Sequence, residues 1–327
     1  MSTLTLKGPY WVTVRQYRRT LWLAGAAVVV SLAVIGGLRI WADQGPDRYL
    51  VGGDRVPADD NRGYEMLRLA IDSAGMYLLL VPLFVGAFVA GPLIAREFES
   101  GTYKVSLTQS VSPAAWLRAK LVSATAGSVL TLLALIGVFH LGWSLVSGSW
   151  GLTWADRGPY EATGIVLFAY VLAAVAVGAL VGQLIRRTLV AMAVTGLVMG
   201  VVLLVMGAFR WSFLPVKTIT GAAGPTLWVP GDGLVMDSGL LTASGARFDQ
   251  LICWEEAART PGTDVTEGLW GKVEAQCQAR HGVTTQYVDY HPESHFWPTQ
   301  LIESGILLAL AAVAAYAAFR VLRARHR

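Results

Sequence analysis

Two long apolar runs, Met76–Ala95 and Val122–Val146, enclose one polar stretch, residues 96–121. About 20 helical residues, rising 1.5 Å each, cross the hydrocarbon core of a bilayer, so each run predicts a membrane span. A short charged stretch between two spans must lie at a water interface, where a soluble partner can reach it. The sequence therefore predicts a membrane fold in which residues 96–121 can contact a soluble partner.

The composition agrees with a membrane fold. Of the 327 residues, 54% are hydrophobic and 15% are charged, whereas a soluble protein carries about 25% charged residues. Lipid offers no partner to backbone groups, and the runs lack the alternation of barrel strands, so we expect helices. The predicted fold class is therefore an all-α polytopic membrane protein with six transmembrane helices. The six predicted spans are Leu21–Leu38, Met76–Ala95, Val122–Val146, Gly164–Ile185, Leu189–Ala208 and Leu301–Phe319.

The loop charges predict the orientation of these spans. Residues 1–20, 96–121, 186–188 and 320–327 together hold 14 Lys and Arg and two acids, whereas the loops of the other side hold 12 Lys and Arg and 19 acids. Short basic loops stay in the cytoplasm, so both termini are predicted to be cytoplasmic, in a multi-pass protein of the cell (plasma) membrane. The basic residues are dispersed as juxtamembrane anchors, which also favours membrane lipids over nucleic acid as partners.

Four regions follow from this topology. Residues 1–20 are predicted to form a cytoplasmic amphipathic helix at the headgroup level, followed by an uncleaved first span. Residues 21–208 hold spans one to five, and residues 301–327 hold span six and a basic cytoplasmic tail. Residues 209–300 form the larger extracytoplasmic segment between helices five and six. A loop of this length is rarely structureless, so we expect a small subdomain with one helix over Phe248–Ala258.

The chain has only two cysteines, Cys253 and Cys277, and both lie in the extracytoplasmic segment. An oxidising compartment favours a disulfide between them, although two unpaired thiols would also fit the sequence. Cys277 also precedes His281 at a spacing that metal sites use, but no complete set of four ligands is present. We therefore predict a disulfide and no metal site.

The sequence lacks the motifs of an enzyme. It has no G-x-x-x-x-G-K-[ST], no H-E-x-x-H and no C-x-x-C, so we expect neither a nucleotide site nor a catalytic residue nor a cofactor in this chain. Two ionisable side chains other than tyrosine do fall within predicted spans, Glu303 and His140. Intramembrane charges often mark transport pathways, which makes both residues candidates for one. The alternative is that Glu303 lies near the surface and reaches water or a loop donor.

The polar stretch 96–121 contains helix signals. Ser112 followed by Pro113 is typical of an N-cap and first helical position, which predicts a helix running into span three. A short helix is also predicted over Thr102–Leu107, after a break at Gly101. The stretch can therefore be a structured docking segment, whose charges fix the register of a partner. A plain solvated loop whose basic residues anchor the spans fits equally well.

The residues of this stretch resemble a known family. The run Arg96–Thr102 reads REFESGT, and it is followed by Thr108–Ser112 and by Leu117 with Lys120 three residues later. This pattern resembles the signature of type-2 ATP-binding-cassette (ABC) transporter permeases. The six spans, the cytoplasmic termini and the basic N-terminal helix are similar too. The segment around Trp297 resembles an actinobacterial-like subgroup found in high-GC bacteria.

The resemblance implies a mechanism. Separate ABC ATPase subunits, two in number, would bind ATP and Mg²⁺, and a second permease subunit, identical or paralogous, would complete the transporter. Closure of the ATPases would move a coupling helix within segment 96–121 and switch the pathway between two states. The residues that would form this ATPase-coupling site are Glu97, Glu99, Gly101, Thr102, Tyr103 and Lys104.

The function predicted on this basis is the permease subunit of an ATP-driven exporter for a hydrophobic, lipid-like or peptide substrate. A rival from another class is a membrane sensor or scaffold whose extracytoplasmic subdomain binds a ligand. A third is an ATP-independent carrier that uses Glu303.

Overall fold

The computed structural model describes residues 15, 17–45, 49–51, 54–56, 60–103, 112–148, 152–224, 226–261 and 268–325. The chain divides into two compact units. The first, which we call the span unit, comprises residues 1–213 and 297–327, and the second, the sheet unit, comprises residues 214–296. The predicted N-terminal amphipathic helix lies almost wholly outside the described residues.

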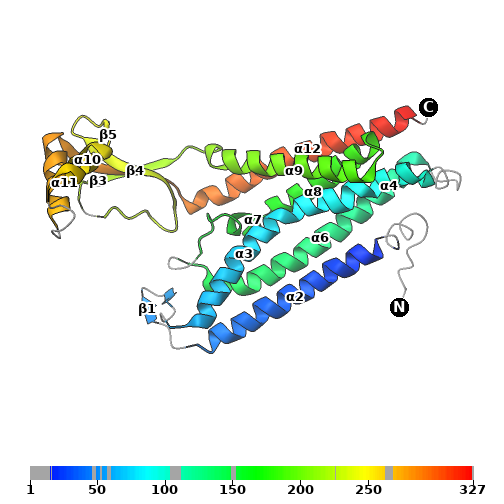
Figure 1. The fold of residues 1–327 in the computed structure, drawn as a ribbon, viewed down its shortest axis with the longest axis horizontal. Coiled ribbons are helices and arrows are strands. Elements are labelled where there is room, and N and C mark those ends of the chain that lie inside the picture. The colour runs from blue at the N-terminus through cyan, green and yellow to red at the C-terminus, as the bar shows by residue number, and fades with distance from the viewer. Residues whose placement is uncertain are drawn as a thin grey trace. The chain divides into compact units, whose positions relative to one another are not determined.

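The span unit is built from long apolar helices that lie side by side (Figure 1). Six helical segments within the described residues are long and apolar enough to cross a membrane, which confirms the six predicted spans. They are α2 (Arg18–Asp43), the continuous series α3 (Arg62–Phe84), η1 (Val85–Ala90) and α4 (Gly91–Ser100), α6 (Pro113–Val146), α8 (Val166–Leu184), α9 (Thr188–Phe209) with η2 (Arg210–Ser212), and α12 (Phe296–Arg325). The short helix α7 (Pro159–Thr163) precedes α8.

The helix α8 forms the centre of the span unit. In its most apolar window 78% of the residues are buried, against 6% for α2, and α8 packs against η1, α4, α6 and α9. Its glycines explain the close packing. A Cβ on Gly178 would lie 2.5 Å from Ala90 Cβ, and one on Gly182 would lie 2.8 Å from the Gly91 carbonyl oxygen. Small residues here let two backbones approach within one chain.

The second span differs from the prediction at its beginning. The predicted span begins at Met76, but α3 begins at Arg62, and the Asn61 side chain caps it by accepting a hydrogen bond from Tyr64 N (3.0 Å). Leu67 and Ile71 are fully buried. Polar residues beside them, such as Arg68 and Asp72, had concealed a helix whose apolar side faces the protein. Further along, Pro82 lies one turn before the π-helix η1, where the span widens.

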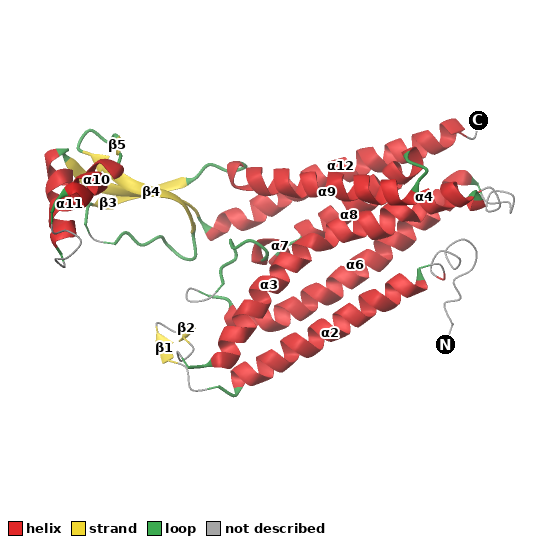
Figure 2. Cartoon of the chain, in the orientation of Figure 1, coloured by secondary structure: helices red, strands yellow, loops and turns green. Residues whose placement is uncertain are grey.

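The sheet unit corrects the all-α prediction. Its antiparallel strands are β3 (Lys217–Ala222), β4 (Leu234–Thr242), β5 (Arg247–Phe248) and β6 (Val283–His291), in the order β3-β6-β4-β5 (Figure 2). The register pairs Lys217 with Tyr290 and Leu240 with Gln286. A further pair, β1 (Tyr49–Val51) and β2 (Asp54–Val56), belongs to the span unit. We missed the sheet because its strands mix polar with β-branched residues and pair across long stretches of the chain.

Two helices and a disulfide complete the sheet unit. The predicted helix is present as α10 (Leu251–Arg259), and a second one, α11 (Leu269–Arg280), was not predicted. Cys253 of α10 and Cys277 of α11 form the predicted disulfide, and both are fully buried. The 3₁₀ turn η3 (Glu293–His295) closes the unit.

Candidate functional site

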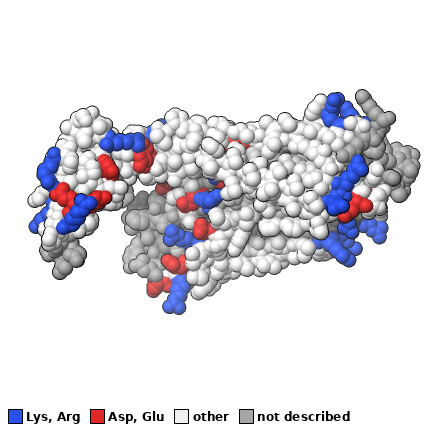
Figure 3. Space-filling view, turned by 45° about the horizontal axis from the view of Figure 1, so that its top comes forward, with Lys and Arg blue, Asp and Glu red and all other residues white. Residues whose placement is uncertain are grey.

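Lys and Arg gather at one end of the span unit, next to a wide belt of uncharged surface (Figure 3). We call this the basic end. There α4 ends, α6 begins, and the short turn Ile185–Arg187 joins α8 to α9. The belt of uncharged side chains is what a helix surface in contact with lipid needs. The segment between spans two and three therefore begins at a membrane boundary.

A buried ion pair connects spans two and three at the basic end. Glu97 Oε1 of α4 lies 2.6 Å from Lys120 Nζ of α6, and Glu97 Oε2 accepts a hydrogen bond from Trp116 Nε1 (3.1 Å). The Lys120 ammonium also lies 5.4 Å from the Trp116 ring centroid. The side chains of Glu97 and Lys120 are only 12% and 4% exposed. We call Glu97, Trp116 and Lys120 the Glu97 cluster; it holds the two helix ends together.

Helix caps fix the backbone on both sides of the Glu97 cluster. Gly101, with φ at +72°, ends α4 in the left-handed conformation that glycine adopts without strain. Ser112 Oγ accepts from Ala115 N (3.2 Å) and Pro113 occupies the first turn of α6, which confirms the predicted N-cap. The Phe98 ring packs on Tyr103 and Trp116, with centroids 4.7 and 6.2 Å away.

A second contact connects the same helix end to span five. The Glu99 carboxylate accepts hydrogen bonds from the backbone N–H of Thr188 (3.0 Å) and from the Thr188 hydroxyl. Thr188 is the first residue of α9, so a negative charge lies at a helix N-terminus, where the helix dipole favours it. Glu99 itself is exposed. The end of α4 is thus bonded to α6 through Glu97 and to α9 through Glu99.

The predicted coupling residues occupy different environments. Glu97 faces the protein and is committed to Lys120, whereas Glu99 and Thr102 are exposed and Tyr103 is half-buried. Ser100 Oγ and Thr102 Oγ1 lie 2.9 Å apart across Gly101. Lys104 and most of the predicted helix Thr102–Leu107 lie outside the described residues. Trp116 and Ser112 were not in the predicted set, although Ser112 carried a clear capping signal.

Glu303 lies in a second polar cluster, inside the span unit. Arg210 of η2 forms a two-pronged ion pair with it, with Nε to Oε2 at 2.9 Å and Nη2 to Oε1 at 3.0 Å. Nη1 of the same guanidinium lies 2.6 Å from Glu161 Oε1 of α7. Glu303 is 0% exposed, Glu161 1% and Arg210 5%. We call these three residues the Arg210 triad.

Tyrosines and an amide complete the surroundings of the triad. Tyr170 OH donates to Glu303 Oε1 at 2.6 Å and Tyr160 OH to Oε2 at 3.4 Å, while the Arg210 guanidinium carbon lies 4.1 Å from the Tyr160 ring centroid. Burial and the Glu303 carboxylate raise the pKa of Tyr160, so its phenol stays protonated and donates. Gln300 Oε1 accepts from Ile165 N and Val166 N, and so caps α8 from α12.

The triad refines two expectations. Glu303 is fully buried rather than near the surface, and its donor is Arg210, which the sequence placed in an outer loop. We also expected no arginine inside a span, whereas Arg210 falls within the apolar helical segment Thr188–Ser212. The sequence placed Arg210 and Glu161 in outer loops, and only folding brings them to Glu303. His140 lies exposed on α6 beside Phe139 and does not bond to the triad.

These features define a class. Six apolar helices make the chain a multi-pass membrane protein, and the end of its second span is bonded to α6 through Glu97 and to α9 through Glu99. Residues 23–210 match the family described as ABC-2 membrane transporter related, and the chain belongs to this family. It is therefore a membrane permease component of an ABC transporter, which implies association with an ABC ATPase. No curated protein matches the chain.

Proposed function

We propose that this chain is the permease subunit of an ATP-driven exporter. Two ABC ATPase subunits would supply the energy with ATP and Mg²⁺, and a second permease subunit, identical or paralogous, would complete the pathway. The cargo proposed is hydrophobic, lipid-like or a peptide. The basic loops support cytoplasmic termini, which would place the basic end against the cytoplasm of the cell membrane and residues 214–296 outside.

The Glu97 cluster is the observation that carries this proposal. A partner that presses on the segment between α4 and α6 would move both helices together, because Glu97 bonds to Lys120 at 2.6 Å and to Trp116 at 3.1 Å. Glu99 would pass the same displacement to α9 through Thr188. In this proposal Glu97 transmits force within the chain, while Glu99, Thr102, Tyr103 and Lys104 face the ATPase and Gly101 provides the turn.

The Arg210 triad supports the exporter over the ATP-independent carrier. A carrier that bound a cation at Glu303 would have to break a two-pronged ion pair with Arg210 and hydrogen bonds from two tyrosines. Arg210 would keep only its contact with Glu161, and breaking a buried, hydrogen-bonded charge pair costs several kcal/mol. We therefore assign Glu303 to holding α12 against α7, α8 and η2, and we assign no cargo contact to His140.

Photocrosslinking in native membranes tests the coupling assignment. A photoreactive amino acid at Ser100, which is exposed beside Gly101, should give an ATP-dependent adduct to a protein that photoreactive ATP also labels. The matched control is Asp156, which is exposed in the loop between α6 and α8 and should give no such adduct. An adduct from Ser100 only to proteins that bind no nucleotide would overturn the exporter proposal and favour the sensor or scaffold.

A further inference from the structure

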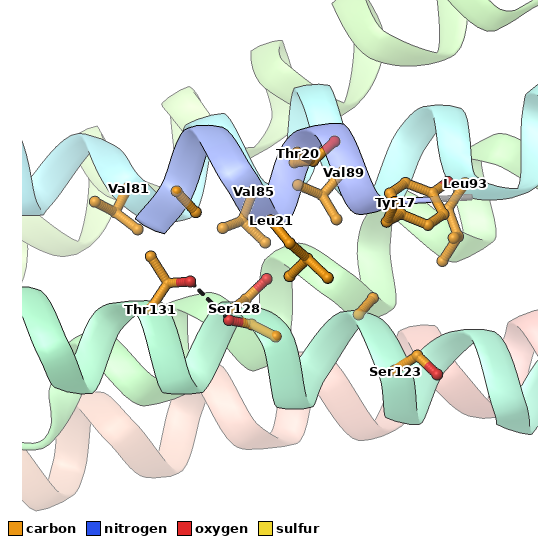
Figure 4. A pocket seen from close by; sticks show the side chains of 13 residues that line it. Tyr17, Thr20, Leu21, Val81, Val85, Val89, Leu93, Ser123, Ser128 and Thr131 are labelled. Carbon is orange, nitrogen blue, oxygen red and sulfur yellow. Dashed lines mark hydrogen bonds between the residues drawn. The ribbon is translucent and has the colours of Figure 1, made fainter. Parts of the chain in front are cut away.

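An apolar pocket lies between α2, η1 and α6 in the half of the span unit near the basic end (Figure 4). Its volume is about 120 Å³, which is below the range of sites for drug-sized molecules and leaves room for one narrow chain. Leu21 and Ala24 of α2, Val85 and Val89 of η1, and Ala124 of α6 line it. The hydroxyl of Thr131, which also faces it, already donates to Gly127 O at 2.9 Å. The pocket therefore suits an apolar chain.

The pocket adjoins a polar hollow at the basic end. The two spaces share three lining residues, Tyr17, Thr20 and Leu93. The hollow adds Arg19 of α2 and Arg96 of α4, together with Glu97, Ser100 and Thr102. Arg19 and Arg96 are both exposed, and neither has a carboxylate partner among the described residues. An apolar pocket thus lies beside two guanidinium groups at the membrane boundary.

The charged side chains that line the hollow favour an anionic ligand. Among the described residues that line the hollow, Glu97 is the one with a carboxylate, and it is committed to Lys120 and Trp116, so these residues leave no carboxylate for the ammonium of a zwitterionic headgroup. Arginine binds phosphate through paired N–H groups. Basic pockets between spans bind acidic headgroups in the same way, each cation contributing to affinity.

We propose that this groove holds one anionic phospholipid. Its phosphate would lie between Arg19 and Arg96 and one acyl chain would extend past Tyr17 and Leu93 into the apolar pocket. The lipid would pack α2 against α4 directly beside the Glu97 cluster. This site is separate from the proposed coupling function, and it can be measured on the isolated chain.

Native mass spectrometry of the full-length protein tests the site, with phosphatidylglycerol and phosphatidylcholine as probes. The wild type should retain one phosphatidylglycerol with about tenfold or greater preference over phosphatidylcholine, and R19Q/R96Q should lose that preference. The matched control R186Q/R187Q removes two exposed arginines of the turn between α8 and α9 at the same end and should keep it. Equal binding of both lipids by the wild type, or an unchanged preference in R19Q/R96Q, would overturn the proposal.

A second variant tests the part of the site that would hold the acyl chain. Gly127 faces the pocket, and a Cβ there would meet only Leu21 at 3.5 Å, so G127F should fill the space and reduce phosphatidylglycerol retention. The control G137F lies on the same helix with nothing within 4 Å of its Cβ and should leave retention unchanged. Loss of the bound lipid on adding millimolar inorganic phosphate, or full retention by folded G127F, would contradict an acyl-anchored ligand. If G127F fails to fold, the lipid preference of R19Q/R96Q tests the proposal on its own.

Discussion

Glu97 Oε1 and Lys120 Nζ lie 2.6 Å apart although 23 residues separate them, and both side chains are buried. This pair joins the last turn of the second span to the first turns of the third. A buried ion pair adds little net stability over an apolar pair of similar size, but removing one partner leaves an unpaired charge. The pair therefore acts as a rigid connection between two helices, at the place where the family's ATPase partner would act.

Lys120→Met should destabilise the protein by about 3–5 kcal/mol, because the Glu97 carboxylate would lose its cation while still buried. The double variant Glu97→Gln/Lys120→Met should recover a large part of this loss, since an amide can still accept from Trp116. Thermal unfolding in detergent, followed by tryptophan fluorescence, measures both. Additive losses in the double variant would show that the two groups do not depend on each other.

Glu99→Gln should leave the unfolding midpoint close to that of the wild type, because Glu99 is exposed and water screens its contact with Thr188. If Glu99 contacts the ATPase, the same variant should lower permease-stimulated ATP hydrolysis in the reconstituted transporter. Arg323→Gln, another exposed charge change at the basic end, serves as the control. Equal ATPase stimulation by Glu99→Gln and wild type would remove Glu99 from the coupling site.

Arg210→Met should be more destabilising than Glu303→Gln. Removing the guanidinium leaves two buried carboxylates, Glu161 and Glu303, without their shared cation, and we expect a loss of about 3–5 kcal/mol. Glu303→Gln leaves Arg210 paired with Glu161 and keeps an oxygen that can accept from Tyr170. Denaturant or thermal unfolding of the purified variants ranks them. If Glu303→Gln were the more destabilising variant, the charge of Glu303 would contribute more to stability than the Arg210 guanidinium, and Arg210 would not be the central member of the triad.

Gly178→Val should destabilise the span unit by about 1–3 kcal/mol, because its Cβ would meet Ala90 Cβ at 2.5 Å and Gly91 N at 2.9 Å. Gly137→Val on α6 is the control, since its Cβ would meet nothing within 4 Å. Thermal unfolding separates the two variants. Similar midpoints for both would show that α8 can move away from α4 without cost.

Cys253→Ser/Cys277→Ser should destabilise the sheet unit by about 3–4 kcal/mol, because the bond closes a loop of 24 residues between α10 and α11. Protease digestion of the full-length protein should then cut residues 214–296 faster, while the span unit keeps its resistance. Each cysteine in the wild type should react with a maleimide only after reduction. Reaction without reduction would contradict the disulfide.

The helices were predictable where composition alone decides their structure. The run Val122–Val146 had to be a helix because lipid satisfies no backbone group, and Ser112 with Pro113 marked where its helix begins. The beginning of α3 at Arg62 was not predictable from average polarity, since its buried residues lie on one side only. The strands of the sheet unit were missed because pairing partners such as Thr218 and Asp289 are 71 residues apart in the chain.

The sequence by itself determined the six spans, their basic loops and the family signature at Arg96–Thr102, because these depend on local composition and on residues close in the chain. Only the tertiary structure decided which charges are free. It buries Glu97 against Lys120 and Glu303 against Arg210, leaves Glu99 of α4 exposed at the N-terminus of α9, and leaves Arg19 and Arg96 beside an apolar pocket with no carboxylate partner among the described residues. A charge acquires its role from the partners that folding brings within about 3 Å, and those partners come from distant helices.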